Sequence, residues 1–309
     1  MKKTKKVVVV GEGKIGKYLA GRLTALGFDI CFFTRKSGDL KKFEQFLGRV
    51  NPLAVFLTIS TKDKGEAALG FIQSCIICSI PVITCEKGAL SYHFKDLQSD
   101  LCWIGYSAAV GGGTKILEYL QGRFWDDQNV EIYAVLNGSL NFFFECIAKG
   151  KTCEQAFKKA LDLKIAEPGA KDPLSFVNGE RRDLFMKGAV LYNLVLSNGS
   201  FITPDVFKVP DWDEAYLKKF TEGSDHYRFI VSFLNDKKKD INGWSVSVAP
   251  RKISGNPFYS WLPSGVHNAV HIIEGENGDG DYFTLSGPGA GLKATTSAML
   301  ADFNELCHL

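Results

Sequence analysis

Residues 7–16 read VVVVGEGKIG, and this stretch decides the fold. Its run of valines predicts a strand that is buried on both faces, as the strands of parallel sheets are. Gly11, Gly13 and Gly16 then form a Gly-x-Gly-x-x-Gly turn, and the KYLAGRLTALG that follows has apolar residues at helical spacing. A strand, a tight turn and a helix in this order are typical of the first βα unit of a dinucleotide-binding domain.

Each glycine has a role in such a unit. Gly11 permits the turn, Gly13 lets the backbone approach a pyrophosphate, and Gly16 lets the helix pack close to the strand. The N-terminus of the helix, where Lys14 and Ile15 lie, offers N–H groups and a positive dipole end to phosphates. We therefore expect these residues to bind a dinucleotide. The alternative is a tight turn without a ligand.

The residues after the second predicted strand, 29–34, bear on which dinucleotide binds. In NAD-binding domains an acidic residue about 20 positions after the glycines holds the ribose 2′-hydroxyl. In this chain Thr34, Arg35 and Lys36 stand there, and no carboxylate does. Because a guanidinium beside an ammonium suits a 2′-phosphate, we expect NADP to be favoured over NAD. The alternative is a solvated basic turn that accepts either cofactor.

Length and composition agree with a soluble globular enzyme. The chain has 309 residues, of which 45% are hydrophobic and 23% charged, enough for one large or two ordinary domains. A net charge of +3 over this length predicts no nucleic-acid partner. The apolar run near the N-terminus is too short for a signal peptide, and no run is long enough to span a membrane. Eight cysteines then indicate a reducing compartment, so we expect a cytoplasmic protein.

Strands and helices alternate through about residue 120, which predicts an α/β fold with a doubly wound parallel sheet of the Rossmann type. Ligands of such sheets bind beyond the carboxyl ends of the strands, so the residues that follow each strand are candidates for the site. One of them is Lys87, just after the predicted strand at residues 81–84. Another candidate is the glycine run at residues 111–113.

From residue 129 the pattern changes to that of an α+β domain. A strand, an Asn-Gly turn and a helix are followed by a second helix, which starts in a capping-box pattern at Thr152 and Gln155. An apolar helix is predicted at residues 183–196, and the more polar segment 204–242 is predicted to be partly helical. The predicted strands of a second sheet are residues 244–250, 267–275 and 281–287.

A set of motifs runs through the chain in a fixed order. They are GEGKIG (11–16), ISTKDKGEAA (59–68), CEKGALS (85–91), AAVGGGTKIL (108–117), VLNGSLN (135–141), AEPG (166–169), HNAV (267–270), GPGAG (287–291) and TTSAMLAD (295–302). In their order and spacing the chain resembles homoserine dehydrogenases over nearly its whole length. The resemblance implies reversible reduction of aspartate 4-semialdehyde to L-homoserine with NADP or NAD, a step towards threonine and methionine, by a homodimer. It also implies a minimal form, without the aspartate kinase or the C-terminal regulatory domain that some members carry.

The resemblance further implies which residues act on the substrate. Lys187 and Lys87 flank the reacting oxygen; we favour Lys187 as the proton donor with Lys87 as its partner, and the reverse assignment stays open. Lysine suits this role because burial or a neighbouring cation can lower its pKa towards neutrality. The substrate-binding residues that the resemblance implies are Glu167, Asp183, Gly138 and Ser139.

Other positions match the family's cofactor and cation sites. Beyond the glycine turn, the cofactor-binding residues that the resemblance implies are Ser60, Thr61, Lys87 and Gly291. Backbone carbonyls near Val110 and Gly112 match the place where the family holds a monovalent cation, Na⁺ or K⁺. We therefore expect a dinucleotide-binding Rossmann domain, residues 1–128 with 286–309, and an α+β catalytic and dimerisation domain, residues 129–285.

Several departures from the family pattern gather around the substrate site. Glu86 replaces the asparagine beside the first catalytic lysine and is expected to raise the pKa of that lysine. Ser107 stands where many members have a glutamate, and Phe176 replaces an aspartate. The chain is longer than usual at residues 168–182, where Glu180 is a candidate for the missing carboxylate.

These departures leave two alternatives to homoserine dehydrogenase activity. The chain reduces another amino-acid semialdehyde with NADP, or it binds NADP and turns substrates over only weakly. Without the resemblance the residues carry plainer interpretations: Lys87 is a solvated loop lysine, and Asp183 with Lys187 is an exposed pair one helical turn apart.

Overall fold

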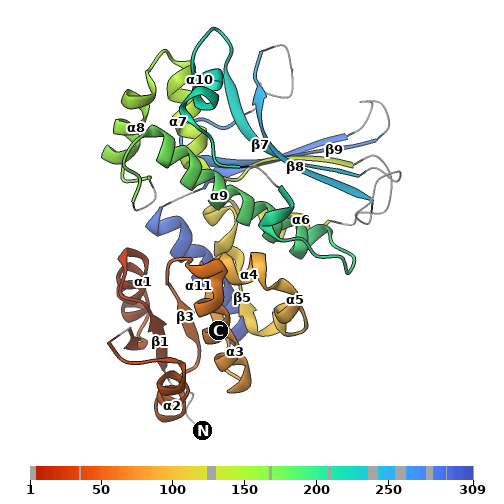
Figure 1. Cartoon of the computed structure of the whole chain (residues 1–309). Helices are drawn as coiled ribbons and strands as arrows, with labels where there is room; N and C mark the ends of the chain where they lie inside the picture. Colours follow the sequence, from red (N-terminus) through yellow and green to blue (C-terminus); the bar gives the residue numbers. More distant parts are fainter. Residues whose placement is uncertain are drawn as a thin grey trace. The chain divides into compact units, whose positions relative to one another are not determined.

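The computed structural model describes residues 5–34, 36–123, 130–166, 169–207, 210–235, 243–254, 262–275, 281–289 and 291–308. It divides into two compact units, one formed by Met1–Gly113 with Leu292–Leu309 and the other by Thr114–Gly291 (Figure 1). These boundaries differ from the expected ones because helix α6 (Ile116–Gln121) contacts the π-helical segment Tyr192–Leu196 of the second unit. The assignment of the cofactor to one domain, and of catalysis and dimerisation to the other, stays a prediction.

A parallel sheet with the strand order β2-β1-β3-β4-β5 forms the centre of the first unit. Its strands are β1 (Lys6–Val10), β2 (Asp29–Phe33), β3 (Val55–Leu57), β4 (Val82–Thr84) and β5 (Ile104–Gly105). The valines of β1 are almost fully buried, which explains why the sequence there is apolar without alternation. The chain adds β2 on one side of β1 and β3 on the other. The doubly wound sheet is therefore confirmed, and its switch point lies between β1 and β3.

Helices cover this sheet. They are α1 (Lys14–Ala25), α2 (Leu40–Val50), α3 (Glu66–Ile77), the short α4 (Gly88–Tyr92) and α5 (Phe94–Leu97), and the C-terminal α11 (Leu292–Cys307). Helices α1 and α11 contact each other and pack over Val7 and Val9 of β1. Arg22 of α1 donates hydrogen bonds of 2.9 Å to Thr296 and Ser297 of α11. The last helix of the chain therefore completes the unit that the first strand begins.

The second unit contains an antiparallel sheet with the strand order β10-β9-β6-β7-β8. Its strands are β6 (Val130–Val135), β7 (Tyr227–Asn235), β8 (Trp244–Lys252), β9 (His267–Glu274) and β10 (Asp281–Pro288). Besides α6, the helices of this unit are α7 (Gly138–Ala148), α8 (Cys153–Asp162), α9 (Pro173–Leu191) and α10 (Glu214–Thr221), and Figure 1 shows α7, α8 and α10 gathered on one side of the sheet. The three predicted strands and the capping box of Thr152 and Gln155 are confirmed.

The sequence analysis missed one strand and the start of one helix in this unit. Within residues 204–242, α10 is helical, but β7 is a central strand because its run RFIVSF is buried between β6 and β8. The helix expected from residue 183 begins at Pro173. Asp172 caps it by accepting a 2.7 Å hydrogen bond from the Ser175 N–H, and proline suits the first helical position. The insertion therefore adds N-terminal turns to α9.

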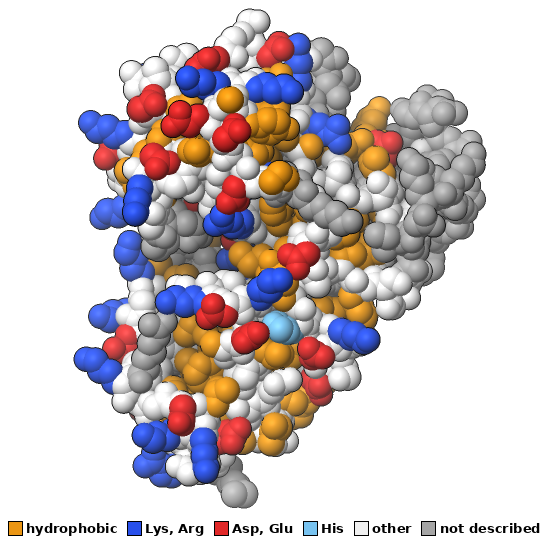
Figure 2. Space-filling model, in the orientation of Figure 1, with side chains coloured by type: hydrophobic (Ala, Val, Ile, Leu, Met, Phe, Trp, Pro, Cys, Tyr) orange, Lys and Arg blue, Asp and Glu red, His pale blue; other side chains and the backbone are white. Residues whose placement is uncertain are grey.

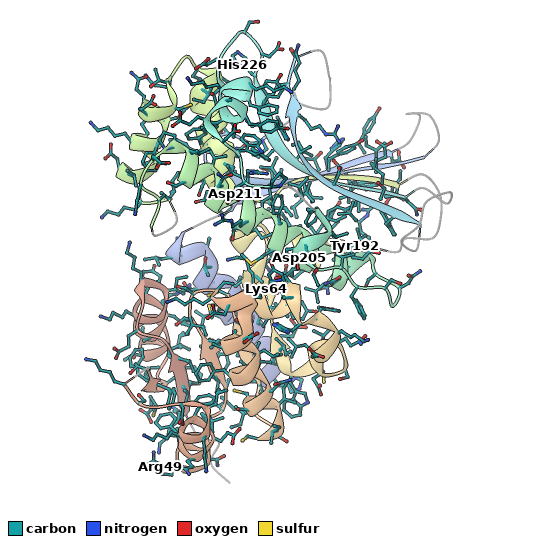
Figure 3. The ribbon with its side chains drawn as sticks, viewed as in Figure 1. Arg49, Lys64, Tyr192, Asp205, Asp211 and His226 are labelled. Carbon is teal, nitrogen blue, oxygen red and sulfur yellow. The ribbon has the colours of Figure 1, made fainter. Side chains whose placement is uncertain are left out.

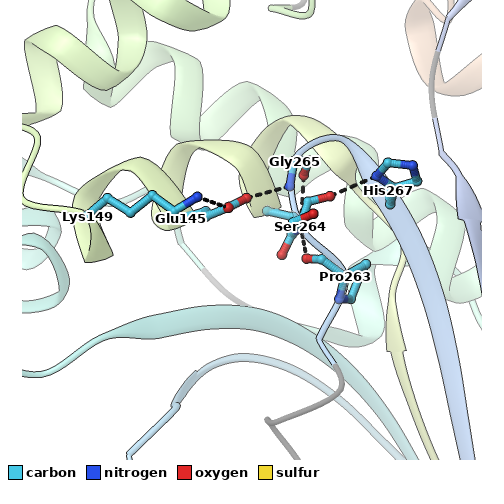
Figure 4. A network of polar contacts seen from close by, with 7 residues as sticks. Glu145, Lys149, Pro263, Ser264, Gly265 and His267 are labelled. Carbon is cyan, nitrogen blue, oxygen red and sulfur yellow. Dashed lines mark hydrogen bonds and ion pairs between the residues drawn. The ribbon is translucent and has the colours of Figure 1, made fainter.

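Glu145 of α7 holds the segment that leads into β9 (Figure 4). Its carboxylate accepts hydrogen bonds from the Gly265 N–H and the Lys149 ammonium. Asn141 donates to the carbonyl oxygens of Pro263 (2.8 Å) and Gly265 (2.9 Å). Burial opposes ionisation of Glu145, but the two hydrogen bonds together with the positive charges of Lys149 and Arg228 outweigh it and hold the pKa of this carboxyl below its ordinary value. The ionised carboxylate therefore stabilises the fold.

We expect Glu145→Gln to lower the free energy of unfolding by about 1–2 kcal/mol at neutral pH, because hydrogen bonds to a charged group are lost. A carboxyl with a lowered pKa stabilises the fold above its unfolded-state pKa and loses this effect as the pH falls through the folded-state value. The difference between variant and wild type should therefore vanish in acid. Denaturant unfolding at several pH values measures it, with Glu154→Gln on the exposed start of α8 as the control. A difference that does not depend on pH would contradict this account.

Candidate active site

The first candidate residues form the turn between β1 and α1, at the switch point of the parallel sheet. Gly11 has a φ of +102°, a conformation that favours glycine. A Cβ atom on Gly16 would collide with the carbonyl oxygen of Gly11 and lie 2.7 Å from Thr58 Oγ1. The Thr58 hydroxyl donates to the carbonyl oxygens of Val10 (3.0 Å) and Gly11 (3.1 Å). The close approach of strand, turn and helix therefore requires these glycines.

The N-terminus of α1 has room for a phosphate group. Gly13 is the N-cap of this helix, and no side chain of the described residues caps it. Among the described residues, a Cβ atom on Gly13 would meet nothing within 4 Å, so the backbone there faces away from them. Lys14 is exposed and Ile15 is half-buried in the first turn. N–H groups at a helix N-terminus beside open space fit the pyrophosphate of a dinucleotide.

The turn after β2 is closed by two residues. The Thr34 N–H donates to Ser37 Oγ (3.0 Å), and the Ser37 N–H donates to the carbonyl oxygen of Thr34 (2.8 Å). Lys36 is exposed in this turn. Arg35 lies outside the described residues, so the preference for NADP stays a prediction.

Further predicted residues follow β3 and β4 or precede α11. Ser60 is exposed, whereas Thr61 is half-buried and donates its hydroxyl hydrogen to the carboxylate of Glu86. Lys87 is half-buried and directly precedes α4. Gly291 is exposed, has a φ of +115° and directly precedes α11. Glu86, which departs from the family pattern, therefore links the loop of Thr61 to the loop of Lys87.

The candidate substrate residues of the second unit gather where α9 meets the start of α7. Lys187 Nζ lies 2.7 Å from Asp183 Oδ2, and the two side chains are only 14% and 8% exposed. They are therefore not the solvated pair that the sequence alone allows. Asn137 Nδ2 donates to Asp183 Oδ2 (3.0 Å) and to Glu180 Oε2 (2.8 Å). A buried amide and an ammonium thus hold two carboxylates at one place.

Glu180 is the residue of the insertion that the sequence analysis named as a candidate for the missing carboxylate. Its side chain is buried beside Asp183, on the same face of α9. Phe176, one turn earlier, packs against Phe143 and Phe157 with ring centroids 5.4 and 5.7 Å apart. Phe176 therefore belongs to the core. One turn further along α9, Glu180 brings a carboxylate to the cluster of Asn137, Asp183 and Lys187.

Gly138 and Ser139 begin α7 beside this cluster. A Cβ atom on Gly138 would lie 2.8 Å from the carbonyl carbon of Val266, so the contact between the two backbones requires glycine. Ser139 Oγ donates to the carbonyl oxygen of Ile165 (2.7 Å). Glu167 lies outside the described residues, and its contact with the substrate stays a prediction.

We expect Asn137→Ala to lower the free energy of unfolding by about 2–4 kcal/mol. The substitution removes the N-cap of α7, which accepts from the Leu140 N–H at 2.8 Å, a loss of about 1 kcal/mol. It also removes a donor from two buried carboxylates, a cost of about 1–3 kcal/mol. Thr152→Ala, which removes only the exposed N-cap of α8, is the matched control and should cost about 1 kcal/mol. Equal losses in denaturant unfolding would mean that the bonds from Asn137 to the carboxylates add nothing.

The predicted cation position lies in a tight backbone segment. Val110 is fully buried, and Gly111 and Gly112 have φ values of +83° and +53°. The Ser107 N–H donates to Asp302 Oδ2 of α11 (2.9 Å), which fixes the start of this segment. In the described ranges no group of three or more His, Cys, Asp or Glu side chains could hold a metal ion. A monovalent cation on backbone carbonyls stays a prediction.

Asn137 is the candidate residue that the sequence analysis overlooked. It was assigned only to a turn, although asparagine directly before an apolar helical run is an N-cap signal. Arg181 was also overlooked. It is 1% exposed, donates to Asn178 Oδ1 (2.8 Å) and lies 4.6 Å from the ring centroid of Trp212, and burial lowers its pKa to about 10. These contacts anchor the middle of α9 and so help to place Asp183.

A family model described as homoserine dehydrogenase matches residues 116–303. The chain is 27% identical to a homoserine dehydrogenase of Lactococcus lactis subsp. lactis (strain IL1403) over 254 residues, which cover 80% of this chain and 56% of that protein. A homoserine dehydrogenase structure from Thermoplasma acidophilum superposes with a TM-score of 0.72 at 16% identity, covering 98% of this chain and 99% of that one. A hyperthermophilic archaeal homoserine dehydrogenase in complex with NADPH gives a TM-score of 0.66 at 19% identity, covering 97% and 96%. The two structural likenesses show the fold.

The chain spans about half the length of the curated relatives it matches. Across the described ranges, no helix has the length and apolar character to cross a membrane. Lysine, arginine, aspartate and glutamate side chains are intermixed on the face that Figure 2 shows, in keeping with the small net charge of +3. The cytoplasmic location and the lack of a nucleic-acid partner stay predictions.

Proposed function

The chain belongs to the homoserine dehydrogenase family, and on this premise we propose that it interconverts aspartate 4-semialdehyde and L-homoserine with a nicotinamide cofactor. The observation that carries the proposal is the buried pair of Asp183 and Lys187, which lies with Asn137 and Glu180 inside the residues that the family model matches. A buried ammonium held by a carboxylate is suited to give a proton to a substrate oxygen and to take it back.

Lys187 acts as the proton donor in this proposal. As the aldehyde is reduced, its oxygen gains negative charge, and Lys187 Nζ gives a proton to that oxygen. In the reverse direction the neutral amine takes the proton from the hydroxyl of homoserine. Asp183, 2.7 Å from Nζ, holds the ammonium in place. NADPH, when bound, would supply the hydride to the aldehyde carbon. Lys87, in the segment after β4, is assigned as the partner of Lys187.

The rest of the substrate is a zwitterionic amino acid, whose ammonium requires carboxylates. The buried carboxylates of Glu180 and Asp183 support such a site in the second unit. Glu167 is assigned the same function from its place in the AEPG motif. Gly138 and Ser139 are assigned to the substrate because they begin α7 beside the two carboxylates.

The cofactor is assigned to the turn between β1 and α1. The open backbone at Gly13 supports this assignment, as does the NADPH complex of an archaeal homoserine dehydrogenase with the same fold. Thr34, Arg35 and Lys36 favour NADP over NAD for the reasons given above. A homodimer and a Na⁺ or K⁺ ion near Val110 and Gly112 complete the proposal and rest on the family resemblance.

A panel of aldehydes tests the proposal. The purified chain is assayed for NADPH oxidation with aspartate 4-semialdehyde, with the homologue one methylene longer and with simple aliphatic aldehydes. We expect the highest kcat/KM for aspartate 4-semialdehyde, with homoserine as the product, and a lower kcat/KM when NADH replaces NADPH. A better substrate elsewhere in the panel would overturn the assigned substrate. Binding of NADPH without turnover on any aldehyde would overturn the assigned activity.

A further inference from the structure

Glu86 is a buried carboxylate that accepts hydrogen bonds from three donors. It is 2% exposed. Oε1 accepts from the Gly88 N–H (2.6 Å) and from the Thr61 hydroxyl, and Oε2 accepts from the Ala89 N–H (3.0 Å). Because a buried charge is strongly unfavourable without such partners, this arrangement is a specific feature of the fold.

The donors come from two different loops. Thr61 lies on the loop after β3, whereas Gly88 and Ala89 lie at the start of α4, after β4. A Cβ atom on Gly65 would collide with the backbone at Gly88 and Ala89, so the two loops are also in direct contact. Lys64, labelled in Figure 3, adds a third contact, since its Nζ lies 5.0 Å from the ring centroid of Tyr92 in α4.

The loop after β3 has a backbone that requires such support. Asp63, Lys64 and Gly65 have φ values of +45°, +55° and +87°, and the first two are not glycine. Residues in this region are strained and persist only where their surroundings hold them. Glu86 and its contact with Thr61 supply part of what holds the loop.

We propose that Glu86 is a positioning residue, which sets the loop of Thr61 and the neighbouring Lys87 through its bonds to both loops. The inference rests on the proposed function, in which Thr61 and Lys87 contact the cofactor or the reacting oxygen. A carboxylate accepts hydrogen bonds at both oxygens, whereas the asparagine of the family pattern is shorter and has one oxygen. The departure at this position therefore replaces a neutral side chain by a charged link between the two loops.

Glu86→Gln keeps the length of the side chain but loses the charge and turns an NH₂ group towards one of the donors. We expect it to lower kcat for aldehyde reduction about tenfold, and to change KM for NADPH less than threefold, because the loops shift while the β1–α1 turn stays intact. Thr61→Val removes the other end of the link and should lower kcat by a similar factor. Because Thr61 is itself assigned to the cofactor, this variant should also raise KM for NADPH. In the double variant the two effects should not add, since both remove the same bond.

Ser91→Ala is the matched control. Ser91 is buried in α4 and donates to the carbonyl oxygen of Gly88 (3.2 Å), but it takes no part in the bond between Glu86 and Thr61. It should leave kcat unchanged even if it lowers the melting temperature. If Glu86 only stabilises the fold, Glu86→Gln should also leave kcat unchanged and lower only the melting temperature. That result would overturn the proposal.

The fluorescence of bound NADPH provides a second readout, which does not depend on turnover. Its emission reports the surroundings of the nicotinamide ring, so we expect it to change in Glu86→Gln and in Thr61→Val but not in Ser91→Ala. If the wild-type protein binds NADPH but reduces no aldehyde, the proposed activity is wrong. The fluorescence still tests whether Glu86 positions the loops, because it does not depend on turnover. An unchanged emission together with an unchanged kcat in Glu86→Gln would refute the positioning function itself.

Discussion

Lys187→Ala is expected to lower kcat for the reduction of aspartate 4-semialdehyde by about 10²–10⁴-fold, the usual contribution of a positioned general acid. The side chain is 14% exposed and its Nζ is held 2.7 Å from Asp183 Oδ2, so its removal takes away a proton donor that the fold holds in one position. KM for NADPH should change little, because the β1–α1 turn belongs to the first unit. Steady-state kinetics of the purified variant measure both constants.

The variant Lys187→Arg tests whether activity requires a proton donor at this position or only a positive charge. Arginine keeps a positive charge beside Asp183, but its guanidinium does not release a proton near neutral pH. We therefore expect this variant to be folded and nearly as inactive as Lys187→Ala. Lys158→Ala, on the exposed side of α8, controls for the loss of a lysine in the same unit and should keep full activity. If Lys187→Ala retained more than a tenth of the wild-type kcat, another residue would have to be the proton donor.

Three glycines of one turn and helix should give three different results when each is replaced by alanine. Gly13→Ala is expected to keep the stability of the protein, because a Cβ atom there meets none of the described residues within 4 Å. It should nevertheless weaken NADPH binding about a hundredfold by blocking the pyrophosphate. Gly16→Ala forces a Cβ atom against Gly11 and Thr58. It should cost about 1–3 kcal/mol in stability and abolish NADPH binding.

Gly21→Ala is the control within the same helix. In the part of the chain that the structure describes, its Cβ atom would have no neighbour within 4 Å, and alanine is favoured over glycine inside a helix by about 1 kcal/mol. It should therefore raise the melting temperature and leave the Kd for NADPH unchanged. Thermal unfolding and NADPH titration of the three variants measure these effects. Normal NADPH binding in Gly13→Ala would place the cofactor somewhere other than this turn.

Much of the first unit was predictable because its signals are local. The valine run, the glycines of the turn and the helix that follows each depend on residues close in the chain. The pairing of Asp183 with Lys187 was predictable for the same reason, since residues four apart share one face of a helix. The sequence alone could not show that this pair is buried, because burial depends on what packs over α9.

The remainder depends on contacts between distant segments. Asn137 reaches Glu180 and Asp183 across 43 and 46 positions of the chain, and Thr61 reaches Glu86 across 25. No local pattern carries such information. The strand β7 was missed because its buried side chains do not alternate with polar ones, and only its place between β6 and β8 explains its conformation.

The most direct test of the proposed reaction follows the hydride itself. NADPH that carries deuterium at the transferable position of its nicotinamide ring is incubated with the wild-type chain and aspartate 4-semialdehyde, and the product is analysed by mass spectrometry. The account predicts homoserine with the deuterium on the carbon that was the aldehyde carbon. A lack of homoserine, or homoserine without the label, would contradict it.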